Sequence, residues 1–147
     1  MNLLLNGNFT EEQRKELSKE IGFDVFEYIT KSVEPQEIVR LLFKDLDAWI
    51  LIRDGLLYSL LTGTVKKAIT WVKNRKSKAI IQTAVELLIT KDNSSFSVNL
   101  FVPVNDVEVF SLLLKEKFDD NFFETVKNKE IISISLDKDG SLKIIRM

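Results

Sequence analysis

Carboxylates are the main side-chain groups of this sequence that could support catalysis, because its 147 residues include neither histidine nor cysteine. Without histidine there is no Ser-His or Cys-His nucleophile pair, and without cysteine there are no disulfides and no thiolate metal sites. Two carboxylates can still hold a hydrated Mg²⁺ or Ca²⁺ ion, so a metal-dependent hydrolase is the catalytic class that remains open. Three close pairs are present: Asp45 with Asp47, Asp119 with Asp120, and Asp137 with Asp139.

Each of these pairs also has a structural explanation. The run Asp137-Lys138-Asp139-Gly140 resembles part of a calcium loop but lacks the third oxygen ligand and the distal Glu of an EF-hand, and Asp-Gly is a common hairpin turn. The Asp119-Asp120 pair suits a helix break or cap. The sequence contains no glycine-rich phosphate loop and no GxSxG motif. We therefore predict no catalytic residue, no metal and no cofactor, and we expect a protein that is not an enzyme.

A basic stretch, residues 66–78, overlaps the end of the apolar segment 47–72, in which residues 48–58 are the most apolar of the chain. Four cations follow this apolar run: Lys73, Arg75, Lys76 and Lys78. Together with Trp71 they suit peripheral contact with anionic lipid, or contact with nucleic acid, with the indole stacked on a base. A solvated connection is the simpler interpretation, since the net charge of the chain is −1. Arg53 and Asp54 interrupt the apolar run, which argues against a membrane-spanning helix.

Three small residues form a stripe on one face of the helix predicted from Asp47 to about residue 73. They are Gly55, Ser59 and Gly63, which are four residues apart. Such a stripe lets another backbone approach closely. It indicates either a dimer or partner-binding groove, or a tight internal contact between the helix and a sheet.

The elements that position these residues begin with a predicted βαβ unit. Residues 3–5 form a short apolar strand, and residues 23–31 are rich in strand formers. Between them, Thr10 with Gln13 makes a capping box, and Gly22 suits the end of the helix.

The middle of the chain predicts two helices. Pro35 suits a first helical turn, and Ile38, Leu41, Leu42 and Leu46 follow at helical spacing. Asp47 then caps a second helix that runs to about residue 73, although a strand over residues 48–53 remains an alternative.

The C-terminal half predicts two hairpins around a helix. Residues 85–90 and 96–102 alternate in polarity on either side of Asp92-Asn93-Ser94, and residues 132–136 and 142–144 flank the Asp-Gly turn. Between the hairpins, Asn105 is the predicted N-cap of a helix that continues or breaks at Asp119-Asp120.

These elements predict one α+β domain over residues 1–147, with a weak subdivision possible near residues 73–78. The order β-α-β, α-α, β-β-α-β-β favours two layers, with helices packed on one face of a mainly antiparallel sheet. Residues 1–7 lack the features of a signal peptide, so we expect a cytoplasmic location. The composition, rich in Lys, Ile, Leu and Asn, suits an AT-rich bacterial genome.

Large apolar side chains exceed what one small core would take up. They include Trp49, Tyr58, Trp71, Phe101, Phe110, Phe122 and Phe123. Aromatic residues are enriched at interfaces, and the C-terminal strand ending at Met147 offers an edge for strand addition. We therefore expect a non-enzymatic protein-binding module, a small subunit or regulator of a larger bacterial assembly, with a protein partner or a homo-oligomer. The alternative is peripheral membrane or nucleic-acid binding through residues 66–78.

Overall fold

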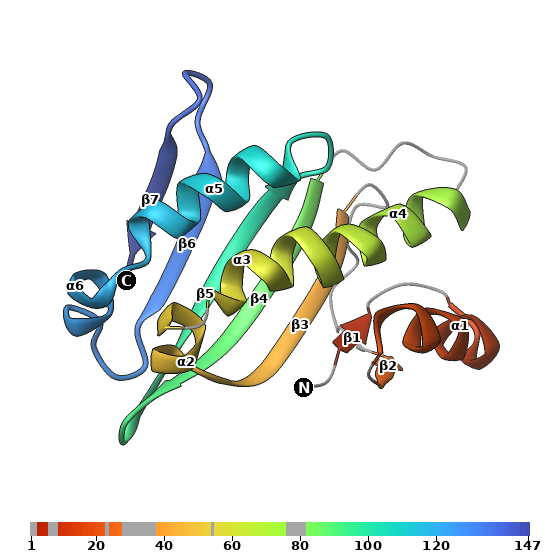
Figure 1. The fold of residues 1–147 in the computed structure, drawn as a ribbon, viewed down its shortest axis with the longest axis horizontal. Helices are drawn as coiled ribbons and strands as arrows, with labels where there is room; N and C mark the ends of the chain where they lie inside the picture. The colour runs from red at the N-terminus through yellow and green to blue at the C-terminus, as the bar shows by residue number, and fades with distance from the viewer. Residues whose placement is uncertain (1–2, 6–8, 23, 28–37, 54, 76–81) are drawn as a thin grey trace.

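Seven strands of the described residues form one sheet in the order β2-β1-β3-β4-β5-β6-β7 (Figure 1). The computed structural model describes residues 3–5, 9–22, 24–27, 38–53, 55–75 and 82–147. The strands are β1 (Leu3–Leu5), β2 (Val25–Glu27), β3 (Ile38–Asp47), β4 (Gln82–Lys91), β5 (Ser94–Pro103), β6 (Ile131–Leu136) and β7 (Leu142–Arg146). The helices are α1 (Glu11–Ile21), α2 (Ala48–Arg53), α3 (Leu56–Ser59), the π-helical segment η1 (Leu60–Val65), α4 (Lys66–Arg75), α5 (Val107–Lys117) and α6 (Asp120–Glu124).

The chain builds the sheet from three strand–helix–strand units followed by a last strand. In each unit the two strands are adjacent and parallel: β1 with β2, β3 with β4, and β5 with β6. The units join one another through the antiparallel pairs β1–β3 and β4–β5, and β7 adds antiparallel to β6. The α+β class is therefore confirmed, in a mixed sheet with three parallel and three antiparallel pairings.

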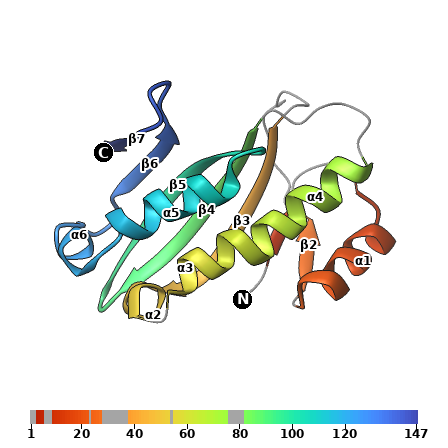
Figure 2. The ribbon, with the colours of Figure 1, turned by 45° about the horizontal axis from the view of Figure 1, so that its top comes forward.

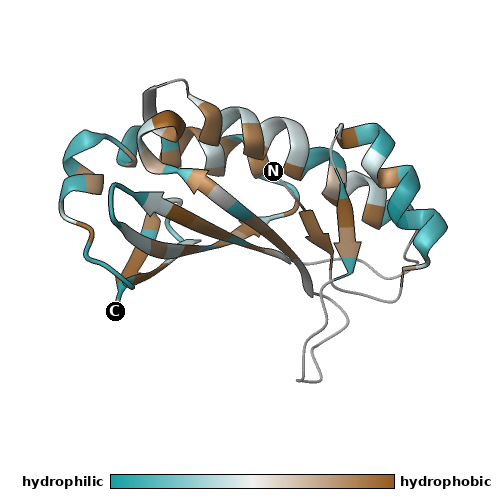
Figure 3. Ribbon diagram, turned by 90° about the horizontal axis from the view of Figure 1, so that it is seen from below, coloured by the Kyte–Doolittle hydropathy of each residue, from teal (hydrophilic) through white to brown (hydrophobic). Residues whose placement is uncertain are grey.

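All described helices lie on one side of the sheet (Figure 3). The β3–β4 and β5–β6 units run in opposite directions, because β4 and β5 are antiparallel, yet both advance the same way across the sheet. With their helices on the same face, the two crossovers must have opposite hands. Such connections are almost always right-handed, and two right-handed crossovers would have placed helices on both faces. This exception leaves the second face of the sheet without a described helix.

The core lies between the helices and the sheet. On β5, every second residue faces the helices and is buried: Phe96, Val98, Leu100 and Val102. Partners from the helical layer, including Leu61, Val65, Phe110 and Leu114, belong to the same continuous cluster of buried side chains. Trp71, Phe110 and Phe123 are buried in this cluster, whereas Trp49 and Phe122 pack against it only partly buried.

The predicted helix over residues 35–46 is wrong, because residues 38–47 form strand β3. Leu41 and Phe43 are buried against the helices, and Leu42 is buried on the opposite side of the strand. The sequence of a strand that is apolar on both faces is a continuous run of apolar residues. It lacks the alternation of apolar and polar residues that marks a half-exposed strand. Its leucines therefore also fitted helical spacing. Residues 28–37, including Pro35, lie outside the described residues.

Most other local predictions are confirmed. Thr10 and Gln13 form the capping box, and Gly22 ends α1 in the left-handed conformation with φ of 85°. Asp47 accepts hydrogen bonds from the backbone N–H groups of Trp49 and Ile50, so it caps α2 as a helix and not a strand. Both C-terminal hairpins are present.

Two helix boundaries differ from the expectation. The helix predicted from Asn105 begins at Val107 with Asp106 as its N-cap. The long predicted helix is divided into α2 and α3 before Gly55, and its continuation passes through the π-helical turn η1.

Candidate functional site

The sheet surface that faces away from the helices is the principal candidate site, and we call it the bare face. On the central strands β4, β5 and β6 its side chains alternate with those of the core and are only partly buried. These residues are Ala84, Glu86, Leu88, Ser97, Asn99, Phe101, Ser133 and Ser135. Among the aromatic residues that the sequence left unassigned, Phe101 belongs to this surface.

The strand registers order the bare face into rows. One row crosses six strands: Leu4, Leu42, Glu86, Asn99, Ser133 and Ile145. A neighbouring row contains Leu88, Ser97, Ile131 and Met147. Apolar side chains therefore lie at both ends of these rows, and serine, asparagine and one carboxylate, Glu86, lie between them.

Charge is scarce at the centre of this face. Glu86 is the only ionisable side chain among the eight central residues named above. The polar groups beside it are serine hydroxyls and one asparagine amide, which donate and accept hydrogen bonds without the large desolvation cost of a charge. The surface can therefore be removed from water at low cost.

A shallow hollow of about 380 Å³ lies at the hairpin end of the bare face. Leu88 contributes to its lining, together with the hydroxyls of Thr90, Ser95 and Ser97 and the cations Lys44 and Lys129. The hollow therefore combines an apolar wall with hydrogen-bonding groups, and its ionic groups lie at the edge of the central, charge-poor region.

Glu130 also lines this hollow, and its carboxylate forms an ion pair with Arg146. The Glu130 side chain is buried and accepts hydrogen bonds from the Arg146 guanidinium. Arg146 holds the pKa of the Glu130 carboxyl below its usual range, and Glu130 in turn raises the pKa of Arg146. The guanidinium also donates to the Thr125 hydroxyl at 2.9 Å and to the Thr125 carbonyl at 3.0 Å. The Glu130 carboxylate therefore fixes the end of β7 through Arg146.

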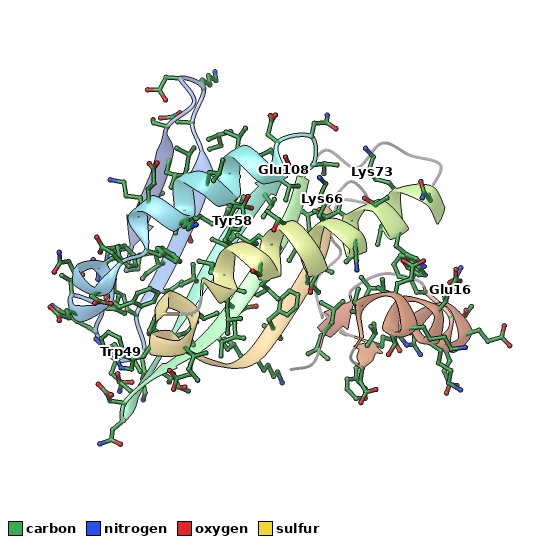
Figure 4. All side chains as sticks on the ribbon, in the orientation of Figure 1. Glu16, Trp49, Tyr58, Lys66, Lys73 and Glu108 are labelled. Atoms are coloured by element: carbon green, nitrogen blue, oxygen red, sulfur yellow. The ribbon has the colours of Figure 1, made fainter. Side chains whose placement is uncertain are left out.

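The basic stretch singled out in the sequence is only partly described. Lys73 is exposed on α4 (Figure 4), the backbone of Arg75 ends that helix, and Lys76 and Lys78 lie outside the described residues. Trp71 is 2% exposed, and its ring centroid lies 5.2 Å from that of Phe9. The indole is therefore a core side chain and does not present a stacking surface for a base or an anchor for lipid.

The first lysine of this stretch is held by the neighbouring helix. Helix α5 runs alongside α3 and η1 (Figure 2), and the Lys66 ammonium lies 2.5 Å from a carboxylate oxygen of Glu108. This pairing lowers the pKa of the Glu108 carboxyl. Lys66 and Lys67 also line an open hollow of about 360 Å³ with Thr62, Thr70 and Asn74.

Among the described residues, no other backbone lies close to either glycine of the small-residue stripe. Gly55 precedes α3 with φ of 63°, a conformation that favours glycine, and Gly63 lies within η1. A Cβ added at either glycine would meet no atom within 4 Å. Ser59 is exposed on the same helix. The internal contact proposed from the sequence is therefore absent at both glycines.

The carboxylate pairs serve local structure. Asp47 caps α2, Asp119 accepts a hydrogen bond from the Phe122 N–H at the start of α6, and Asp139 accepts from the Ser141 N–H and hydroxyl. The side chain of Asp45 lies outside the described residues. Within the described ranges, no group of three or more acidic side chains is arranged to hold a metal ion. No helix among these residues has the length and apolarity needed to cross a membrane.

The bare face was not identified from the sequence, although its signal was present. Leu88 and Phe101 occupy the nominally polar positions of the alternating runs on β4 and β5. Large apolar residues at such positions indicate that the second face has a use beyond contact with water. Comparison with known proteins identified no relative, because no protein-family model matches the sequence and no curated protein or solved structure matches it significantly.

Proposed function

We propose that this chain is a non-enzymatic protein-binding module, a small subunit or regulator of a larger assembly, and that it binds its partner on the bare face. The observation that carries the proposal is the scarcity of charge on a sheet face that no described helix covers. The centres of protein interfaces are depleted in charged residues, and aromatic side chains are enriched there. Phe101 and the scarcity of charge at the centre of the bare face match these two features.

The partner surface should be apolar and neutral at its centre. Leu88 and Phe101 would pack against apolar side chains, and Asn99 would need a hydrogen-bonding group once water is excluded. Glu86 requires a cation or a hydrogen-bond donor opposite it, because an unpaired carboxylate is costly to bury. At the rim, Lys44 favours an acidic group on the partner.

A site-specific photo-cross-linker tests this proposal in cells that make the full chain. Benzoylphenylalanine replaces Phe101 on the bare face or, as the matched control, Leu112 on α5, whose side chain is 50% exposed. We expect discrete protein adducts from position 101 and none from position 112. The substitution Asn99→Lys should abolish the adducts, because it introduces an uncompensated charge into the centre of the interface.

An adduct alone does not support the proposal. Adducts from position 112 only, or adducts from position 101 that persist with Asn99→Lys, would show that the bare face is not the contact surface. Circular dichroism of the Asn99→Lys variant establishes that the fold is retained.

The second candidate is contact with anionic lipid or nucleic acid through residues 66–78. It is favoured by the hollow that Lys66 and Lys67 line on α4, with Lys73 exposed further along the helix. With Trp71 in the core, such binding would depend on charge alone and should decline steeply with salt. Co-sedimentation with vesicles of anionic and of neutral phospholipid tests the lipid case, and equal binding to both vesicle types would exclude it.

A further inference from the structure

The last strand of the sheet has an unpaired edge. Ile131 and Met147 exchange two backbone hydrogen bonds, and the Asp137 N–H donates to the Ser141 carbonyl. In an antiparallel ladder the intervening outward positions are Leu142, Ile144 and Arg146, whose N–H and C=O groups point away from β6. Within the described part of the chain, no residue is hydrogen-bonded to these backbone groups.

This edge is complementary to itself. If two copies of β7 pair antiparallel around Ile144, the Ile144 residues of both copies exchange two hydrogen bonds, and Leu142 of each copy lies opposite Arg146 of the other. On the bare-face side, Lys143 lies opposite Ile145. No like charges face each other directly, so the pairing avoids the usual penalty of like-charged cross-strand neighbours.

Of the two cations on β7, Arg146 is bound within its own chain, whereas Lys143 is exposed on the bare-face side. Edge strands are commonly protected by lysine or arginine side chains that deter pairing. Here the Arg146 guanidinium binds Glu130 and Thr125 within its own chain and lies over the Phe122 ring, 5.4 Å from the ring centroid. Its charge is therefore compensated inside the monomer.

Exposed apolar side chains gather beside this edge. Ile131, Ile145 and Met147 are 43%, 47% and 74% exposed, and the β6–β7 register places them together on the bare face. In the symmetric pair, the two sets would lie on the same side of the joined sheet. Burying them adds a hydrophobic contribution to the backbone hydrogen bonds.

The two ends of β7 carry opposite charge. The turn before the strand contains Asp137 and Asp139, and the Ser141 N–H and hydroxyl lower the pKa of the Asp139 carboxyl. The other end lies beside a hollow of about 470 Å³ whose lining includes Lys127 and Lys129 in addition to the Arg146–Glu130 pair. Antiparallel pairing brings the acidic turn of one copy level with Lys129 of the other. This charge complementarity favours a second copy over an unrelated strand.

We propose that two copies of this chain pair through β7, antiparallel and centred on Ile144, to form one continuous sheet. The two-fold axis is then normal to the sheet, so the bare faces of both copies lie on the same side of the joined sheet and form one surface. The interface is independent of the proposed partner-binding function, since it uses the edge and not the centre of the sheet. A pairing this small is expected to be weak, with dissociation in the micromolar range.

Sedimentation velocity of the full chain across a concentration series, up to roughly 300 µM, tests the proposal. We expect reversible dimerisation, and Ile144→Pro should raise the dissociation constant by at least about tenfold. Proline at 144 removes an N–H that has no partner in the monomer, so the β6–β7 ladder is retained. The matched control Ile144→Val keeps the N–H and should dimerise normally.

A charge reversal identifies the occupant as a second copy. Lys129→Glu or Asp139→Lys alone should weaken the dimer by roughly threefold to thirtyfold at low salt. Mixing the two single variants should give a heterodimer in which both contacts are complementary, one with the native charges and one with the charges reversed, and the double variant should recover pairing with itself. This rescue does not depend on how well Ile144→Pro folds.

Amide exchange by NMR gives a residue-level readout. The amides of Leu142, Ile144 and Arg146 should become protected as the concentration rises, whereas those of Lys143 and Ile145 are protected throughout. A chain that stays monomeric over the concentration series overturns the proposal, as does a dimer that Ile144→Pro leaves intact or whose edge amides remain unprotected. None of these outcomes bears on the cross-linking result at position 101.

Discussion

The two surfaces of this molecule that lack a covering layer differ in composition. The outer surface of the helices carries paired and single charges, such as Lys66, Glu108 and Lys115 (Figure 4). The bare face has a centre of serine, asparagine, leucine and phenylalanine with a single carboxylate, Glu86. A surface that stays in water needs charge to remain soluble and free of aggregation. This difference is the basis of our proposal that the bare face is the contact surface.

The topology supports the same division. The β5–β6 crossover places α5 on the same side of the sheet as the other helices. It therefore has the opposite hand to the β3–β4 crossover, although such connections almost always share the right hand. That arrangement concentrates the core on one side of the sheet. The other side has no described helix to exclude water from its neutral side chains.

Two neighbouring residues on β5 test this division most strongly. Leu100→Ala removes a fully buried side chain and should lower the free energy of unfolding by about 2–5 kcal/mol. Phe101→Ala removes a larger side chain on the bare face and should cost less than about 1.5 kcal/mol, because the ring is only partly buried in the monomer. Urea denaturation measures both. An equal or larger cost at Phe101 would mean that the second face belongs to the core.

The ion pair at the border of the two surfaces should have an intermediate effect. Glu130→Gln leaves Arg146 without its carboxylate partner and should lower the free energy of unfolding by about 1–3 kcal/mol at neutral pH. Arg146 lowers the pKa of Glu130 below its usual value of 4.5, so the stabilisation is complete above that value and is lost as the pH falls through the lowered pKa.

Thermal unfolding of both proteins between neutral pH and strong acid measures this loss. The gap in melting temperature between the native chain and Glu130→Gln should close only in acid. The exposed residue Glu124 provides the control, since Glu124→Gln should leave the melting temperature unchanged at every pH. A gap that is constant with pH would show that the carboxylate acts by packing and not by its charge.

The outer helical surface should tolerate change with the smallest effect. Glu108→Gln removes the charge that faces Lys66 between α5 and α4, on a surface where water screens both groups. The melting temperature should move by no more than about 1 °C, and cross-linking from position 101 should be unaffected. A loss of cross-linking would move the contact surface to the helices.

Local chemistry made much of the fold predictable. The Thr10–Gln13 capping box, the Asp47 cap and the Asp-Gly turn each satisfy backbone groups through neighbours in sequence, so the sequence alone contains the reason for them. Both C-terminal hairpins followed from alternating runs for the same reason. Strand β3 was not predictable in this way, because it pairs with β1 and β4, which are distant in sequence.

The candidate site depended on information that the sequence holds only indirectly. Alternation shows that Leu88 and Phe101 share a face, but which face the helices cover depends on the hand of each crossover. Trp71 illustrates the converse. Its position beside lysines suggested a surface role, yet the helix turns the indole inward onto Phe9 while Lys73 points to water.

Carbene footprinting of the full chain tests the role of the bare face most directly. The labelling of Leu88 and Phe101 is compared between the purified chain and the chain isolated from cells with its bound proteins, with Val109 and Leu112 on α5 as internal references. We predict that Leu88 and Phe101 lose labelling in the isolated complex while the two α5 residues keep theirs. Unchanged labelling of Leu88 and Phe101, or protection of α5 alone, would contradict the assignment of the bare face as the contact surface.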